Sequence, residues 1–326
     1  MKALLKQSAR ALLGFGPVQA LLRARALRND PITVLCYHTL GPDRGGPDAW
    51  TVLRVSDFRA HVAYLRTVYD IVSMDQAEAE GPARKRAGQP RAVLTFDDGE
   101  AGLFRHLLPI VEAIELPVTV YVATGQIESG RAYWFDRVMA ALGTGAREVE
   151  LEGLGQWRIP DQPGPDRWTA LGDLLEALKR TAPDHRERLT DVILAKHLLP
   201  EGRPPLAPLT MDELVTLAAS PWITIGAHSH CHNLLDQVSL SEATDSIARS
   251  RRLLQDWTGQ EVAHFAWPNG NRNAALGQAA SDCGFRTATA LGGGLWHPGA
   301  DPYAIPRVPV GRYDDTARLA LRLVGL

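Results

Sequence analysis

Seven short apolar runs, rich in β-branched and aromatic residues, recur along the chain and predict buried strands. These runs are Ile32–His38, Arg91–Phe96, Pro117–Val122, Trp222–Ala227, Ala263–Trp267, Arg286–Ala290 and Ile305–Val310. Most of the intervening stretches have apolar residues at helical spacing, as in Val55–Tyr69 and Leu103–Ile114. Because strands that alternate with helices form parallel sheets, and because this many units can close on themselves, the pattern predicts an α/β fold built as a closed or nearly closed β/α barrel.

A long region interrupts this alternation. Residues 128–209 contain no strong buried strand and are rich in Gly, Pro, Arg and Glu, with helical stretches near Trp168–Arg180 and Arg186–Leu199. We therefore expect a mostly helical insertion within a barrel that spans residues 31–326. Near the start of the insertion, Trp134 lies between two other aromatic residues. Aromatic planes suit sugar rings, although core packing is the more frequent role of such a side chain.

The first thirty residues form a separate segment in this prediction. Leucines and basic residues are interspersed along residues 1–27. No apolar run reaches the roughly 20 residues of a membrane span, and no signal peptide is indicated. The pattern is typical of a basic amphipathic helix, which either contacts an anionic membrane surface or packs against the barrel. We expect a cytoplasmic or membrane-associated protein with residues 1–30 as an amphipathic helical segment.

Composition and charge narrow the class of protein. The 326 residues are 45% apolar and 22% charged, which is usual for a globular protein with one large core. A formal net charge of -2 supplies no general attraction to nucleic acid, so no nucleic-acid partner is expected. The three cysteines, Cys36, Cys231 and Cys283, are far apart in the sequence. This spacing argues against a disulfide framework and against a structural zinc site built on thiolates.

Two adjacent carboxylates, Asp97 and Asp98, directly follow the second predicted strand. An Asp-Gly pair after a strand is also a common hairpin signal, so a plain turn is the alternative interpretation. However, the residues after Gly99 have helical rather than strand spacing. The unit is therefore a strand, an acidic loop and a helix, and β/α enzymes place catalytic side chains in such loops.

A tract of three histidines, His228, His230 and His232, follows the fourth predicted strand. Such a tract is either a surface histidine run or a metal site, since neutral imidazole is the commonest metal ligand. His228 and His232 are four residues apart, and on one helical turn both would face the same point. Together with a carboxylate they would form a His-His-Asp set with open positions for water, as catalytic metal sites have.

The fifth predicted strand leads into Trp267-Pro268-Asn269-Gly270. An Asn-Gly pair by itself indicates only a turn, but here the backbone N–H groups after the strand can point into the barrel mouth. His38 ends the first predicted strand, and Arg307 lies within the last one. Because a barrel gathers the carboxyl ends of its strands on one face, we expect these residues to meet the acidic loop and the histidines there.

TFDDG at residues 95–99 and HSxxH at residues 228–232 resemble the first two motifs of the polysaccharide deacetylases, the chitooligosaccharide-deacetylase homology domain of carbohydrate esterase family 4. FAWPNG at residues 265–270 and Tyr37-His38 are similar to motifs of a bacterial exopolysaccharide-type branch. The resemblance spans residues 32–310. It implies a deformed (β/α) barrel of about seven parallel strands, and a divalent metal, usually zinc, that serves to remove acetyl groups from a glycan.

By this resemblance, Asp98, His228 and His232 hold the metal, and Asp97 is the general base. A divalent metal polarises an acetyl carbonyl and lowers the pKa of water, and a carboxylate beside it can take the proton. A backbone N–H near Asn269 would then hold the oxyanion.

Four further residues are expected to contact the glycan substrate. They are His38, Trp134, Trp267 and Pro268.

Two departures from the family pattern bear on catalysis. Many members pair the base with an Arg of the third motif, where this chain has Ala266. Arg307 is the candidate replacement, because a charged residue in an apolar run usually has a partner; a solvent-facing edge residue is the alternative. The late His that is the general acid in the family has no clear match. His297, His38 and a water molecule on the metal remain alternatives.

The combined prediction is a metal-dependent hydrolase that removes N-acetyl groups from a bacterial polysaccharide or its precursor, with zinc as the expected metal. Because the family's Arg and late His are missing from their usual places, a non-catalytic glycan-binding protein on the same barrel is the alternative from another class. An O-acetyl esterase is a third interpretation, since it would use the same residues.

Overall fold

The computed structural model describes residues 31–45, 49–79, 89–143, 147–162, 164–197, 206–292, 294–297 and 299–323. The amphipathic segment expected at residues 1–30, together with its membrane contact, lies outside the described residues and stays a prediction. Within the described part of the chain, no helix is long and apolar enough to cross a membrane.

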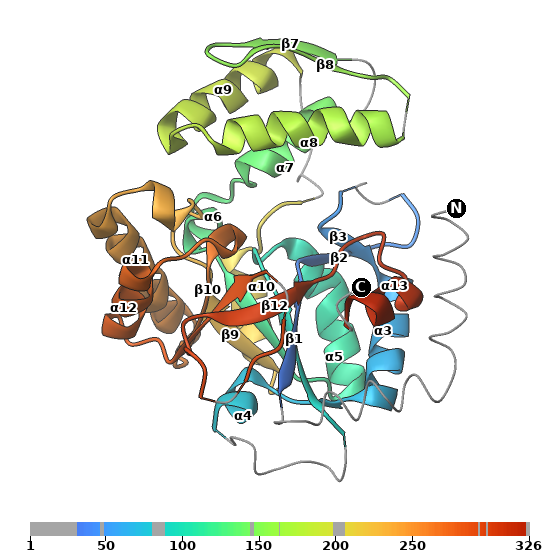
Figure 1. The fold of residues 1–326 in the computed structure, drawn as a ribbon, viewed down its shortest axis with the longest axis vertical. Helices are drawn as coiled ribbons and strands as arrows, with labels where there is room; N and C mark the ends of the chain where they lie inside the picture. The colour runs from blue at the N-terminus through green and yellow to red at the C-terminus, as the bar shows by residue number, and fades with distance from the viewer. Residues whose placement is uncertain are drawn as a thin grey trace.

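Seven parallel strands close into a barrel (Figure 1). The strands are β1 (Ile32–Tyr37), β5 (Arg91–Phe96), β6 (Val118–Val122), β9 (Ile223–Ala227), β10 (His264–Ala266), β11 (Thr287–Leu291) and β12 (Ile305–Pro309). Neighbours pair in the order β1-β12-β11-β10-β9-β6-β5, and β5 pairs with β1 along its whole length, which closes the ring. The predicted barrel of parallel strands is confirmed, because every apolar run identified in the sequence is one of its strands.

Helices cover the outside of the barrel. The longer ones are α3 (Val55–Val68), α5 (Leu108–Ile114), α10 (Met211–Ala218), α11 (Leu240–Thr258) and α12 (Ala274–Asp282). One turn of π-helix, η2 (Leu103–Leu107), leads into α5. Helix α11 begins with a capping box, in which the Ser239 hydroxyl accepts from the Glu242 N–H and the Glu242 carboxylate accepts from the Ser239 N–H. This reciprocal pair satisfies two backbone donors of the first turn and fixes where the helix starts.

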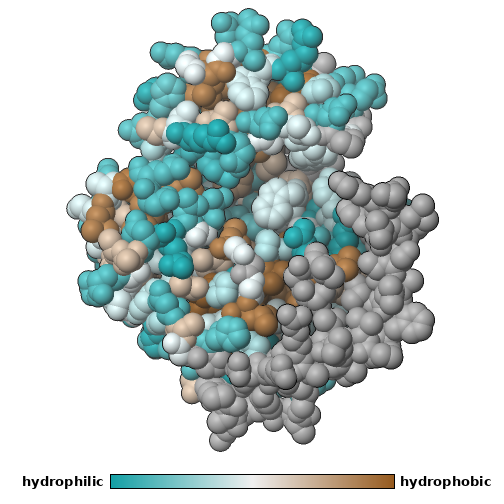
Figure 2. Space-filling view, in the orientation of Figure 1, coloured by the Kyte–Doolittle hydropathy of each residue, from teal (hydrophilic) through white to brown (hydrophobic). Residues whose placement is uncertain are grey.

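A lobe of three helices and one hairpin interrupts the barrel; we call it the insertion lobe. It consists of α7 (Trp134–Leu142), β7 (Arg147–Leu151), β8 (Gly155–Ile159), α8 (Pro165–Lys179) and α9 (Pro183–Lys196). Figure 1 places it above the barrel, with α7 and α8 toward the barrel and the hairpin farthest from it. Its apolar side chains pack with one another in a cluster separate from the barrel core, and its outer surface is mostly hydrophilic (Figure 2).

The antiparallel hairpin of β7 and β8 was not predicted from the sequence. Its strands are exposed on one side, so that buried Val149 and Leu151 alternate with exposed glutamates. A search for buried apolar runs misses strands of this kind, because only every second residue is apolar.

Two three-residue strands, β2 (Thr39–Gly41) and β3 (Val52–Arg54), form a small parallel pair beside the barrel mouth. They were also not predicted, because three residues carry too little periodicity to indicate a strand. The pair matters for the site, since it holds the residues that follow β1 and those that precede α3 at the rim of the barrel.

Candidate active site and metal centre

The acidic loop directly after β5 turns sharply at the barrel mouth. The Asp97 N–H donates to the Tyr37 carbonyl at 3.0 Å, which extends the β5–β1 pairing by one residue. Asp98 (φ 74°) and Gly99 (φ 73°) then both have left-handed backbone conformations. A side chain at Gly99 would also crowd Val122, since a Cβ there would lie 3.0 Å from its Cγ1. Two left-handed residues in succession turn the chain into η2, so the hairpin interpretation of Asp-Gly is wrong.

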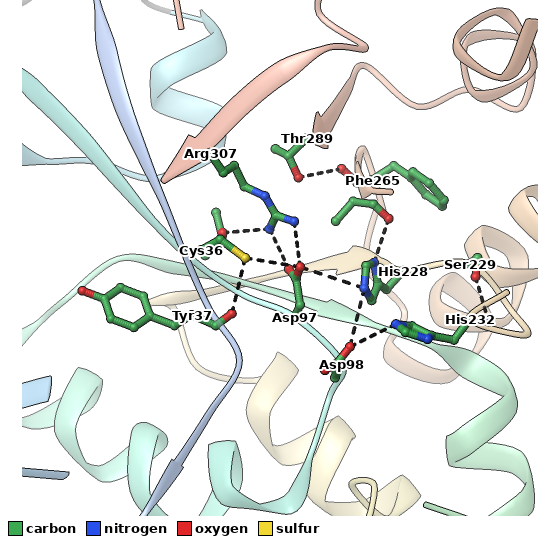
Figure 3. Close-up of polar contacts among 12 residues, drawn as sticks. Cys36, Tyr37, Asp97, Asp98, His228, Ser229, His232, Phe265, Thr289 and Arg307 are labelled. Atoms are coloured by element: carbon green, nitrogen blue, oxygen red, sulfur yellow. Dashed lines mark hydrogen bonds and ion pairs between the residues drawn. The ribbon is translucent and has the colours of Figure 1, made fainter. Parts of the chain in front are cut away.

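Asp97 forms a buried, bidentate ion pair with Arg307 (Figure 3). The Arg307 Nη1 and Nη2 donate to the two carboxylate oxygens at 2.6 and 2.7 Å, and Nη1 also donates to the Thr95 hydroxyl at 3.0 Å. The Arg307 side chain is 0% exposed, and its guanidinium carbon lies 5.6 Å from the centre of the Tyr121 ring. The sequence predicted this partner for Arg307, and the solvent-facing alternative is wrong.

The Asp97–Arg307 pair decides the charge of Asp97. Burial by itself raises the pKa of this carboxyl, but Arg307, and then His228, lower it more, so that it lies well below its usual range. The guanidinium pKa is raised in turn by the carboxylate, against the effect of burial. Asp97 is therefore an ionised carboxylate, in direct reach of the cavity described below.

Three donor groups converge beside this pair: the Asp98 carboxylate and the imidazoles of His228 and His232. The Asp98 Oδ1 lies 3.5 Å from His228 Nε2 and 3.2 Å from His232 Nε2. Ligand atoms about 2.0–2.2 Å from a tetrahedral ion are separated by about 3.3–3.6 Å, so these donors are spaced as the ligands of a divalent metal ion are. All three residues line the cavity described below.

His228 is oriented for such a role by its other ring nitrogen. Its Nδ1 lies 2.7 Å from the Ala266 carbonyl oxygen and donates to it, which leaves the Nε2 lone pair facing Asp98 and His232. Burial lowers the pKa of His228 to about 4, with Asp97 opposing this shift. The imidazole is therefore neutral near pH 7, the form in which it binds metals.

His232 reaches the same point by an irregular loop and not by the helical turn that its spacing suggested. The loop that carries His228 and His232 has no helical hydrogen bonds, and Ser229 (φ 63°) and His232 (φ 53°) are both left-handed. The Ser229 hydroxyl accepts from the His232 N–H at 3.0 Å, which holds the tight bend. His230 points elsewhere, with its Nδ1 2.9 Å from the Thr124 hydroxyl.

Two further carboxyl groups, Glu100 and Asp136, are buried close to Asp98. Burial is the main cause that raises the pKa of each, and the negative charge of Asp98 adds to it. Both are held toward the neutral acid, so they add little negative charge beside Asp98. These two residues were not identifiable from the sequence, because their proximity to Asp98 depends on the start of α7 lying against the acidic loop.

A cavity of about 320 Å³ opens in front of these groups, between the barrel mouth and the insertion lobe. From the barrel side it is lined by His38, Trp50, Thr51, Asp97, Asp98, His228, His232, Leu234, Asn269 and Leu291. From the lobe it is lined by Trp134, Phe135, Met139, Gly172, Leu175, Glu176, Lys179 and Arg186.

His38, Trp134 and Asn269 line this cavity, so their proposed roles toward a substrate stay predictions. Trp134 also packs in the core of the insertion lobe, as the alternative interpretation expected. His38 packs edge-on to Trp50, and its buried Nδ1 has no hydrogen-bond partner among the described residues. Asn269 (φ 57°) is left-handed, and its side-chain oxygen accepts from Lys179 Nζ at 3.2 Å. Trp50, which is 47% exposed, was missed because nothing in the sequence near it indicates a strand end.

Trp267 and Pro268 were expected to contact substrate, and the structure corrects this expectation. The Trp267 side chain is 0% exposed, packs on Phe265 and donates its indole N–H to the Tyr303 carbonyl at 3.0 Å. Pro268 is buried as well, and neither residue is among those that line the cavity. Both are core residues, and they anchor the turn at Asn269 to the core.

His297 was one of three alternatives for the general acid, and its position excludes it. The preceding residue, Trp296, forms a bridge with Ile32, the first residue of β1. His297 is exposed there, at the amino-terminal end of the strands, whereas the cavity lies at their carboxyl end. His38 lies at the carboxyl end of the same strand and faces the cavity.

Comparison with known proteins gives a consistent result. The family model described as "Polysaccharide deacetylase" matches residues 84–288, and no curated protein matches the chain. The deacetylase PplD of Streptococcus pyogenes is 15% identical, with a TM-score of 0.60 over 90% of this chain and 98% of that one. IcaB from Ammonifex degensii is 18% identical, with a TM-score of 0.59 over 90% and 97%. A de-N-acetylase from Aggregatibacter actinomycetemcomitans is 15% identical, with a TM-score of 0.57 over 90% and 100%. At these identities the structures show a shared fold.

Proposed function

We propose that this chain, which belongs to the polysaccharide deacetylase family and is thus a hydrolase, removes N-acetyl groups from a bacterial polysaccharide or its precursor in a metal-dependent reaction. One observation supports the metal dependence of the reaction and the role of Asp97 as the base. The donor atoms of Asp98, His228 and His232 converge on one point, and beside them Asp97 is kept ionised by Arg307.

The neighbouring carboxylates have different roles in this proposal. Asp98, with the two imidazoles, would hold the ion, and the mixed nitrogen and oxygen donors suit zinc. A divalent metal bound there would polarise the acetyl carbonyl and lower the pKa of the attacking water. Asp97 is the general base that takes the proton of this water, and Arg307 fixes the orientation of its carboxylate. The backbone N–H of Asn269 is the proposed donor to the oxyanion.

The substrate class is supported by the proteins of similar fold. One of them is a de-N-acetylase, which favours the N-acetyl linkage over the O-acetyl linkage. The alternative of a non-catalytic glycan-binding protein was motivated by the missing Arg of the third motif and by the missing late His. Arg307 makes the pairing that this Arg would make, from another strand, so one of these two reasons disappears.

Acetate release from N-acetylglucosamine oligomers tests the proposal. We expect release by the zinc-loaded protein, loss of release after chelation, and metal binding weaker by on the order of 10-fold or more in His232→Ala. His230→Ala is the matched control from the same loop and should keep both the metal and the activity, since its ring contacts Thr124. Equal rates before and after chelation would contradict the metal dependence. A metal-loaded protein that releases no acetate from N-acetylated or O-acetylated glycans would favour the glycan-binding alternative.

His38 is the proposed general acid for the leaving amine, because it faces the cavity and its Nδ1 is buried without a described partner. We expect His38→Gln to lower kcat by roughly 10²-fold while the metal content stays unchanged. His297→Gln is the control and should have wild-type kcat, since His297 lies at the opposite end of the barrel. A similar loss of kcat in both variants would contradict this assignment, and so would a wild-type kcat in His38→Gln.

A further inference from the structure

One aromatic side chain contacts both loops that carry the proposed metal ligands. Tyr133 directly precedes α7, the first helix of the insertion lobe, and is 2% exposed. Its hydroxyl donates to the Asp98 carbonyl oxygen at 2.6 Å. Its ring lies edge-on to the His232 imidazole, with 4.6 Å between the ring centres. Tyr133 therefore joins the acidic loop to the histidine loop.

The hydrogen bond to Asp98 supports a backbone conformation that is unfavourable by itself. Asp98 has a left-handed backbone (φ 74°), in which the Cβ atom of an L-residue lies too close to the carbonyl oxygen. The Tyr133 hydroxyl binds this same carbonyl, in a buried bond whose loss would leave the oxygen without this donor. The backbone of Asp98 also sets the direction of its carboxylate, whose Oδ1 lies 3.2 Å from His232 Nε2. The hydroxyl of Tyr133 thus favours the conformation in which the carboxylate faces the histidines.

The two proposed histidine ligands are oriented in different ways. The His228 ring is fixed by the hydrogen bond from its Nδ1 to the Ala266 carbonyl. No described residue makes such a hydrogen bond with the second ring nitrogen of His232. Its ring instead packs against Tyr133 at 4.6 Å and Phe135 at 5.8 Å, and these two rings stack on each other at 5.1 Å. Edge-on aromatic packing of this kind has a preferred geometry, so it fixes the orientation of the His232 ring.

We propose that Tyr133 is a positioning residue of the metal centre, which holds Asp98 and His232 at ligand spacing before the ion binds. The inference rests on the proposed function, since it takes these residues to bind a divalent ion. A site that is ordered in advance loses less conformational freedom on binding, so its affinity is higher. Residues that orient metal ligands typically change the metal affinity by about 10- to 100-fold. The segment that begins the insertion lobe thereby contributes to the metal centre as well as to the cavity wall.

Removal of the hydroxyl alone tests this inference. Tyr133→Phe keeps the ring against His232 and deletes only the bond to Asp98, so the Kd for zinc, measured by competition with a chelator, should rise by about 10-fold. The visible absorption of the cobalt-substituted protein should change as well, because it reports the geometry of the ligands. Tyr303→Phe is the matched control. It deletes a hydroxyl bond to the Phe285 carbonyl at 2.8 Å, and neither of these residues lines the cavity, so the wild-type Kd and cobalt spectrum should be kept.

Unfolding curves of the metal-free proteins separate positioning from a general loss of stability. Both variants should be folded without metal, and only Tyr133→Phe should bind zinc more weakly. A wild-type Kd and cobalt spectrum in Tyr133→Phe would overturn the inference, and so would an equal rise of the Kd in Tyr303→Phe. A failure of the proposed function gives a different result. In that case zinc affinity would depend on Tyr133 as expected, but the zinc-loaded wild-type protein would release no acetate.

Discussion

Asp97→Asn is expected to lower kcat for acetate release by roughly 10²–10⁴-fold, the contribution typical of a positioned general base. The amide has nearly the shape of the carboxylate but cannot take a proton from water. The metal should stay bound at wild-type stoichiometry, because Asp98, His228 and His232 are unchanged. Steady-state kinetics together with metal analysis of the same purified sample would measure both effects.

Asp98→Asn is the matched control, since it makes the same chemical change one residue later. It removes a proposed ligand, so here the metal content should fall together with the activity. The difference between the two variants would separate a base from a ligand, which activity alone does not. If Asp97→Asn kept the wild-type kcat, or lost its metal as Asp98→Asn does, the assignment of the two carboxylates would be wrong.

The convergence of these residues could be predicted from the sequence for a simple physical reason. All barrel strands run parallel, so a residue directly after any strand lies on the same face as a residue after any other. Asp97, His228 and His38 are each the first residue after a strand, so their positions depend only on where the strands end. Arg307 was predictable on another ground, because a cation within a buried strand needs a partner.

Other features depended on geometry that the sequence does not contain. Trp267 follows a strand just as His228 does, yet its ring turns into the core, because the choice between core and cavity depends on the neighbouring strand and on the partner found at Tyr303. The spacing of His228 and His232 fits a helical turn, but the left-handed conformation of Ser229 produces the same convergence differently. The residues of α8 that line the cavity were not identifiable, since their orientation is set by how the insertion lobe lies against the barrel.

Removal of Arg307 is expected to have the largest effect on stability. Arg307→Met keeps much of the side-chain volume but leaves the buried Asp97 carboxylate without its cation. Breaking a buried ion pair in this way costs about 3–5 kcal/mol in the free energy of unfolding. Chemical denaturation at pH 7 would measure the loss. Arg286→Met is the control, because its partly exposed ion pairs at the other end of the barrel should stabilise far less.

The effect should depend on pH in a definite direction. In the wild-type protein the pKa of Asp97 is lower in the folded state than the roughly 3.9 expected for an unfolded chain. The stabilisation from this pair is thus fully present at pH values above the pKa of Asp97 in the unfolded chain. It is lost as the pH falls toward the lower pKa of Asp97 in the folded protein. In Arg307→Met, burial would raise the pKa of Asp97 instead, so the variant would bind a proton more readily. The stability difference between the two proteins should therefore be largest near pH 7. It should shrink as the pH falls through the raised pKa of Asp97 in the variant, which lies above roughly 3.9, and further toward the lowered pKa in the wild type.

A double variant separates the charge effect from a loss of packing. Asp97→Asn removes the negative charge, so that adding Arg307→Met to it should cost several kcal/mol less than Arg307→Met costs in the wild-type background. Equal costs in both backgrounds would show that Arg307 stabilises the barrel through packing against Tyr121 and Thr95 alone. In that case its role in orienting the base would have to be abandoned. A cost that depends on Asp97 would identify the ion pair as the element that keeps the base both ionised and in place.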